Sequence, residues 1–170
     1  MGNVTTAESY SPALTAGYYA HATTAGYYAN AATTGFNAHA TTTGDGGRAT
    51  TAGNFSHATT VGDDAHATTA GNGSHALTAG DYAHATTTGR LAHALTAGDR
   101  AKTSVSGENA IAVAVGANSA ARAANGGFIV LAQYNGDTVV AVKTAQAGKD
   151  GIKPDTWYKL SPTGEFVEAE

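Results

Sequence analysis

The chain has 170 residues, including 22 glycines, no cysteine and a single tryptophan, and only 13% of its residues are charged. Its length falls within the ~100–200 residues of one ordinary domain, and the absence of cysteine excludes a disulfide framework and a thiolate metal site. The net charge of −4 provides no basic stripe, which argues against nucleic acid as a partner.

Residues 1–7 form a lead-in to the first repeat. They lack the charged and apolar segments of a signal peptide, and no apolar run approaches the ~18 residues of a membrane span. We therefore expect no membrane span, and a cytoplasmic or virion-associated protein unless another route exports it.

From residue 8 to residue 124 the chain repeats every nine residues. A glycine recurs at this interval from Gly17 to Gly116, and Glu8 takes its place in a preceding degenerate unit, which makes thirteen units. The consensus is G-x-x-A-H-A-T-T-A, with alanine at position six and threonine at position eight throughout the first ten units. Self-similarity at a fixed period is typical of solenoids.

The nine-residue period favours strands over helices. It matches neither a 3.6-residue helix nor a heptad, and threonine and glycine are poor helix formers. Because strands alternate faces, the small residues at positions four, six and eight are expected inside and positions five, seven and nine outside. Two repeats per 18-residue coil leave room for an interior, so we predict an all-β parallel solenoid with a thin core.

All seven histidines occupy position five of the repeat. An 18-residue coil would align five of them in one ladder, namely His21, His39, His57, His75 and His93. Imidazole is both a metal ligand and a titrating group, so these five are the candidate metal site. Neighbours ~4.8 Å apart point in parallel and converge poorly on one ion, and a stack of neutral, partly solvated imidazoles is the alternative. We expect no bound cofactor.

Two other outward rows suggest binding functions. Asp45, Asp63, Asp81 and Asp99 recur every 18 residues directly after a glycine, where turn chemistry is the alternative to calcium binding. Threonines at position seven could form an ice-binding array, although leucine and alanine interrupt that row. No cysteine, carboxylate pair or unique general base suggests an enzyme, and we expect a non-catalytic chain without a small-molecule ligand.

Apolar residues gather at the two ends of the repeat region and are candidate interfaces. The aromatic set at the beginning is Tyr10, Tyr18, Tyr19, Tyr27, Tyr28 and Phe36. Exposed aromatic patches typically mark contact surfaces, and folding of these rings over the first coil is the alternative. The later set is Ile111, Val113 and Val115, on an outer face that would need cover. Residues 107–123 resemble head repeats of trimeric autotransporter adhesins, which implies solenoid packing and trimers.

Residues 125–170 leave the repeat and predict a small antiparallel β-meander. Strands are expected at 128–134 and 138–143, joined by a turn at Asn135-Gly136-Asp137, and at 156–160 and 165–168. This segment holds most of the large apolar side chains. It can cover the last coil and block strand addition there.

The tail carries the sequence Ile152-Lys153-Pro154-Asp155-Thr156-Trp157-Tyr158-Lys159-Leu160, followed by Gly164-Glu165-Phe166-Val167-Glu168. With the preceding nonapeptides it resembles uncharacterised repeat proteins of bacteria and prophages. That resemblance implies a bacterial or phage origin and a solenoid fold, and it implies no activity. The favoured hypothesis is a structural protein that self-associates into an oligomer or filament. A binding module for phage or cell-surface adhesion is the alternative, ahead of ice or metal binding.

Overall fold

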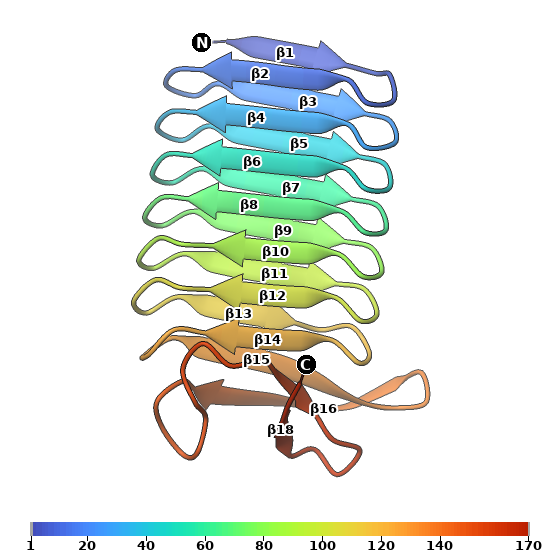
Figure 1. The fold of residues 1–170 in the computed structure, drawn as a ribbon, viewed down its shortest axis with the longest axis vertical. Helices are drawn as coiled ribbons and strands as arrows, with labels where there is room; N and C mark the ends of the chain where they lie inside the picture. Colours follow the sequence, from blue (N-terminus) through green and yellow to red (C-terminus); the bar gives the residue numbers. More distant parts are fainter. Residues whose placement is uncertain (1, 170) are drawn as a thin grey trace.

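The chain folds into a β-solenoid, described for residues 2–169 in a computed structural model (Figure 1). It is all-β, as predicted, and successive repeats alternate between two facing sheets of nine strands each. No helix in the described part of the chain is long and apolar enough to cross a membrane.

We call the two sheets A and B. Sheet A contains, in spatial order, β1 (Asn3–Thr6), β3 (His21–Ala25), β5 (His39–Thr43), β7 (His57–Val61), β9 (His75–Ala79), β11 (His93–Ala97), β13 (Ile111–Ala114), β15 (Phe128–Asn135) and β16 (Thr138–Gln146). Sheet B contains β2 (Pro12–Ala16), β4 (Asn30–Thr34), β6 (Arg48–Ala52), β8 (His66–Ala70), β10 (His84–Thr87), β12 (Lys102–Val105), β14 (Ala120–Ala123), β17 (Tyr158–Leu160) and β18 (Phe166–Glu168).

The coils of the repeat region contain 18 residues, as the sequence predicted, and the last coil, which ends on β15, contains 17. Repeat strands pair in parallel with the strand two repeats away, so that His21 lies beside His39 and Asn30 beside Arg48. Equal residues of the repeat therefore stack in straight rows along the solenoid axis, at the ~4.8 Å spacing of neighbouring strands.

The interior is built from alanine and threonine. Positions four, six and eight are buried, as Ala20, Ala22 and Thr24 illustrate with exposures of 1% or less. Most threonine hydroxyls at the buried position eight have no hydrogen-bond partner within the described part of the chain. The oxygens concerned belong to Thr6, Thr15, Thr24, Thr33, Thr42, Thr51, Thr60, Thr69, Thr78 and Thr87.

Glycine at position one permits the backbones of adjacent coils to approach closely. A Cβ on Gly80 would lie 2.1 Å from the carbonyl oxygen of Gly62, and one on Gly98 would lie 2.0 Å from that of Gly80. No side chain fits there, which explains the glycine at this position in the eleven repeats from Gly26 to Gly116.

Position three of each turn adopts the left-handed conformation, which the sequence did not predict. Glycine and asparagine are the usual occupants, and Gly46 and Asn37 conform. Tyr10, Tyr28 and Tyr82 instead hold φ near +60°. Because such backbone strain costs about 1 kcal/mol or more per residue, the rings are expected to recover stability through stacking or contact.

The C-terminal segment differs in detail from the predicted meander. β15 pairs in parallel with β13 and continues sheet A, because Ile129 and Leu131 fill the buried positions of the repeat. β16 then adds antiparallel to sheet A, across the hairpin turn expected at residues 135–137. β17 and β18 add antiparallel to sheet B, so the tail extends both sheets rather than forming one separate meander.

Candidate functional site

The five predicted histidines form a continuous ladder on the outer face of sheet A. Successive ring centroids lie 4.8, 4.8, 4.9 and 5.2 Å apart from His21 to His93, and the first four rings are nearly parallel. The predicted stacking of His21 on His39 is confirmed. On sheet B, His66 and His84 stack in the same way at 4.9 Å.

Burial and mutual repulsion lower the pKa values of the central ladder histidines. Partial burial is the larger cause for His39, His57 and His75, and the neighbouring imidazole adds to it in each case. A protonated ladder would place like charges one strand apart, so the neutral form is favoured in the folded chain.

Acidification is expected to destabilise the fold through this ladder. The folded pKa values lie below the unfolded value of about 6.5, so the unfolded chain binds more protons as the pH falls below that value. The stability present above pH 6.5 is therefore lost as the pH falls through the folded pKa values. We expect the melting temperature to fall between pH 7.5 and pH 5.5, and to fall less in His57→Asn, which interrupts the ladder. Equal losses in both proteins would contradict this account.

The ladder geometry offers no convergent metal site. Within residues 2–169, no group of three or more His, Cys, Asp or Glu side chains is placed to hold a metal ion. Each ladder imidazole has another ladder imidazole as its stacked neighbour, so none is set apart as a general base or as the centre of a ligand set.

The aspartate row bonds to the backbone of the next coil. Asp45 Oδ1 accepts a hydrogen bond from the Asp63 N–H at 3.1 Å, and Asp63 Oδ1 accepts one from the Asp81 N–H at 2.9 Å. Asp99 continues the chain to the Ala117 N–H. Asn54 and Asn72 do the same along the opposite edge. These carboxylates therefore have a structural use, and their spacing requires no calcium.

The outer face of sheet A carries no charged side chain. We call it the uncharged face and define it by positions five, seven and nine of β1 to β15. Towards the N terminus it presents histidine and threonine. Towards the C terminus it becomes apolar, through Leu77, Leu95, Ile111, Val113, Phe128 and Val130. Sheet B differs, because Arg48, Lys102 and Arg122 lie on its outer face.

A shallow groove runs along the apolar part of the uncharged face. Its volume is about 440 Å³, and its walls include His75 and His93 on one side and Leu77 and Leu95 on the other. Ile111 and Val113, predicted to need cover, line its C-terminal end and remain half-buried. Val115 lies at the margin, where its carbonyl accepts a hydrogen bond from the Tyr134 hydroxyl.

The six predicted aromatic residues lie on the turns at both edges of the first coils. Tyr10 stacks on Tyr28 at 5.5 Å, and Tyr18 packs against Phe36 at 6.0 Å. All six are exposed, with Tyr10 and Tyr18 at 72% and 71%. The rings thus form short ladders along the edges.

The outward threonines form no long uninterrupted array. On sheet A, Thr23, Thr41 and Thr59 are followed by Leu77 in the same row. On sheet B, Thr50 and Thr68 follow Ala32. The uninterrupted threonine row at position eight is buried, as the alternation of the strands predicted.

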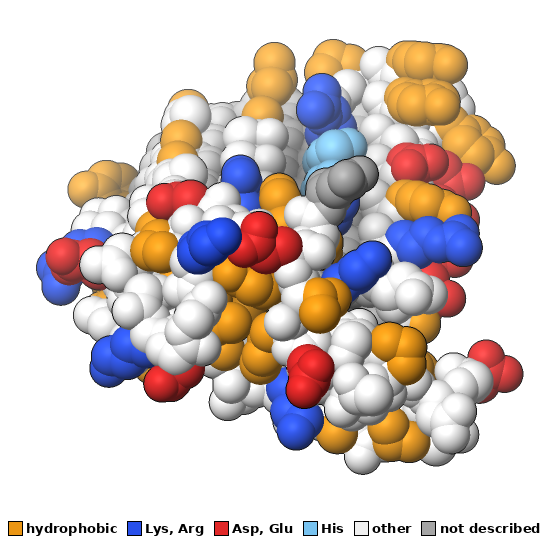
Figure 2. Space-filling view, turned by 60° about the horizontal axis from the view of Figure 1, so that its bottom comes forward, with side chains coloured by type: hydrophobic (Ala, Val, Ile, Leu, Met, Phe, Trp, Pro, Cys, Tyr) orange, Lys and Arg blue, Asp and Glu red, His pale blue; other side chains and the backbone are white. Residues whose placement is uncertain are grey.

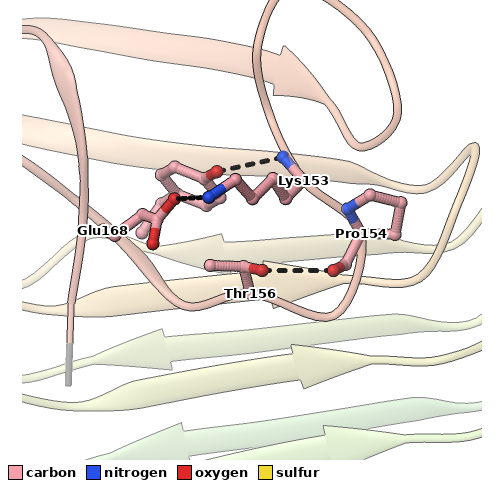
Figure 3. A network of polar contacts seen from close by, with 5 residues as sticks. Lys153, Pro154, Thr156 and Glu168 are labelled. Atoms are coloured by element: carbon pink, nitrogen blue, oxygen red, sulfur yellow. Dashed lines mark hydrogen bonds and ion pairs between the residues drawn. The ribbon is translucent and has the colours of Figure 1, made fainter.

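The tail motif closes the C-terminal end of the solenoid. Tyr158 is buried and its hydroxyl accepts a hydrogen bond from the Lys153 N–H, while the Lys153 ammonium pairs with Glu168 at 2.6 Å (Figure 3). The Asp155 N–H bonds to the Ala123 carbonyl of β14. This network ties the loop before β17 to both β18 and the last repeat strand of sheet B.

Trp157 has a role that the sequence did not reveal. The Arg122 guanidinium lies 4.7 Å and the Lys102 ammonium 5.5 Å from its ring centroid. Such cation–π contacts anchor the tail against the outer face of sheet B. Figure 2 shows this end of the rod, where basic and acidic side chains are interspersed over the tail.

Comparisons with known proteins identify no relative of the chain. No family model matches it, and neither a curated protein nor a solved structure shows significant similarity.

Proposed function

We propose that the chain is a non-catalytic structural protein that self-associates through the uncharged face of sheet A. The observation that carries this proposal is the absence of any Asp, Glu, Lys or Arg from that face, from β1 to β15. Charged residues are depleted at the centres of protein interfaces. Lys, Arg, Asp and Glu are mostly found exposed on protein surfaces, so their absence from this outward face is informative.

The size of this face suits a protein partner. Eight strands at ~4.8 Å spacing, each about five residues wide, cover roughly 600 Å² in each copy. Two such faces would bury about 1,200 Å² in total, which is at the lower limit for a specific, stable interface. The flat sheet can therefore form a sheet-on-sheet contact with a second copy, in the manner of two stacked sheets about 10 Å apart.

The apolar half supplies the driving force for this contact. Leu77 and Phe128 are more than a third exposed, and Ile111 and Val113 lie between them in adjacent rows. A fully buried aliphatic or aromatic side chain contributes about 1.5–3 kcal/mol. The row of neutral histidines beside them is compatible with burial at pH 7 but not after protonation.

Charge introduced into the apolar half of this face should weaken the contact. Leu95→Lys is expected to weaken association at least about tenfold, because each copy would bring an unpaired ammonium into the interface. Thr86→Lys is the matched control, since Thr86 holds the same repeat position on sheet B and is also half-buried. Sedimentation equilibrium of both variants against the parent chain tests the proposal. Equal association of all three would refute it.

The groove along this face supports a second candidate function, which is ligand binding. Histidine and leucine walls suit an extended amphipathic molecule, as an adhesion module would require. In that case Leu95→Lys would alter ligand retention without altering the association state of the chain.

A further inference from the structure

The core of the solenoid is uncovered at its N-terminal end, whereas Ile152 and Tyr158 of the tail join the core at its C-terminal end. Within residues 2–169, β1 and β2 terminate the two sheets at the N-terminal end with no strand on their outer side, and β16 and β18 terminate them at the other end (Figure 1). Exposed edges of this kind are ready templates for further strand pairing.

Both edge strands direct backbone groups outward. The Gly2 carbonyl bonds to His21 of β3, and the Ser11 carbonyl bonds to Asn30 of β4. In a parallel strand, successive residues direct their N–H and C=O groups alternately to the two neighbouring strands. Since Gly2 and Ser11 bond inward to β3 and β4, the backbone groups of Thr5 and Leu14 point away from the solenoid. Pro12 also points outward, but it lies at the strand end and lacks only the N–H.

The side chains of this end also lack a partner. Val4 and Thr6 point inward but are only half-buried, whereas the same rows are fully buried in the next coil. Leu14 is 67% exposed. Tyr10 ends a ring stack, since Tyr28 covers one of its faces.

The end is almost free of charge. Between residues 2 and 44, Glu8 is the only Asp, Glu, Lys or Arg in the sequence. Two identical ends can therefore meet without appreciable like-charge repulsion, which favours a second copy of the chain as the occupant.

We propose that two copies join end to end through β1 and β2, related by a two-fold axis parallel to the strands. β1 and β2 run in opposite directions, and β2 lies about half a coil below β1 (Figure 1). This axis places β1 of each copy antiparallel to β2 of the other copy. Both of these strand pairs are then separated by the ~4.8 Å of neighbouring strands in a sheet. An axis perpendicular to the sheets would bring only β1 to that distance from its counterpart.

The register of this junction follows from the repeat. Thr5 and Leu14 both hold position seven, at the centre of their strands. Thr5 therefore faces Leu14 of the second copy, and their outward backbone groups can form a hydrogen-bonded antiparallel pair. Val4 then lies opposite Thr15 of the second copy on the inner side. Tyr10 meets Tyr10 of the second copy at one edge and continues the ring stack.

The junction extends the proposed self-association to a second, separate surface. Each of the two contacts alone is two-fold and closes at a dimer. A chain that uses both would link copies alternately through faces and ends, and could grow into a filament.

Charge pairs at the junction test both its existence and its register. Thr5→Lys/Leu14→Lys places two ammonium groups at each facing pair and is expected to weaken end-to-end dimerisation at least about tenfold. Thr5→Lys/Leu14→Glu places opposite charges there and should retain the dimer. The side chains of residues 5 and 14 point outward, so both double variants should keep the fold. Thermal melts followed by circular dichroism check this.

The experiment is best made in the Leu95→Lys background, where the face contact is removed. We expect the Leu95→Lys variant to sediment as a dimer, at twice 16.9 kDa. Adding Thr5→Lys/Leu14→Lys should give a monomer. Adding Thr5→Lys/Leu14→Glu instead should again give a dimer. A monomer in the Leu95→Lys background at all concentrations would overturn the junction. Loss of the dimer in both double variants would overturn its register. If Leu95→Lys leaves association unchanged, the face proposal fails, and the same double variants in the parent chain test the junction alone.

Discussion

Gly80→Ala is expected to destabilise the solenoid by about 3–5 kcal/mol, from steric overlap and backbone strain together. The added Cβ would lie 2.1 Å from the Gly62 carbonyl oxygen, and Gly80 has φ of +150°. Relief of the overlap requires the two coils to separate, which weakens the hydrogen bonds on either side. Chemical denaturation followed by circular dichroism measures the effect.

Gly17→Ala is the matched control for this prediction. Gly17 occupies the same repeat position with φ of +125°, but no coil precedes it at that edge and a Cβ there would meet nothing within 4 Å. It should retain the strain and avoid the overlap. Similar losses in the two variants would show that backbone conformation, not the approach of coils, explains the glycine row.

Replacement of buried threonines by valine is expected to stabilise the fold. Thr24, Thr42, Thr60 and Thr78 stack in one inner row of sheet A, and their hydroxyls have no hydrogen-bond partner among residues 2–169. A buried hydroxyl without a hydrogen bond costs about 1–3 kcal/mol, and valine keeps the shape and the β-branch. The fourfold variant should gain at least about 3 kcal/mol.

Serine substitution at the same four positions is the informative counterpart. It keeps the hydroxyl and removes a methyl group, so it should destabilise the chain by about 1 kcal/mol per site. A loss of stability in the valine variant would mean that the hydroxyls bond to one another or to bound water.

The solenoid was predictable because its signals are local and repeated. Glycine every ninth residue sets the coil, and the contrast between alanine at position six and histidine at position five sets which face turns inward. The histidine ladder followed directly, since a period of nine with two repeats per coil aligns residues 18 apart.

The features that remained hidden depend on contacts between distant segments. The cation–π contacts of Trp157 with Lys102 and Arg122 need the tail to cross the outer face of sheet B, and no sequence pattern specifies that path. The parallel pairing of β15 was concealed because large side chains at Ile129 and Leu131 replace alanine and threonine. The left-handed tyrosines ran against residue preference.

Sedimentation velocity of the unaltered chain over a dilution series tests the self-association account most directly. We predict species of at least twice 16.9 kDa that grow with concentration, and that Leu95→Lys combined with Thr5→Lys/Leu14→Lys reduces to the monomer. A single 16.9 kDa species for the unaltered chain at every concentration would contradict the account.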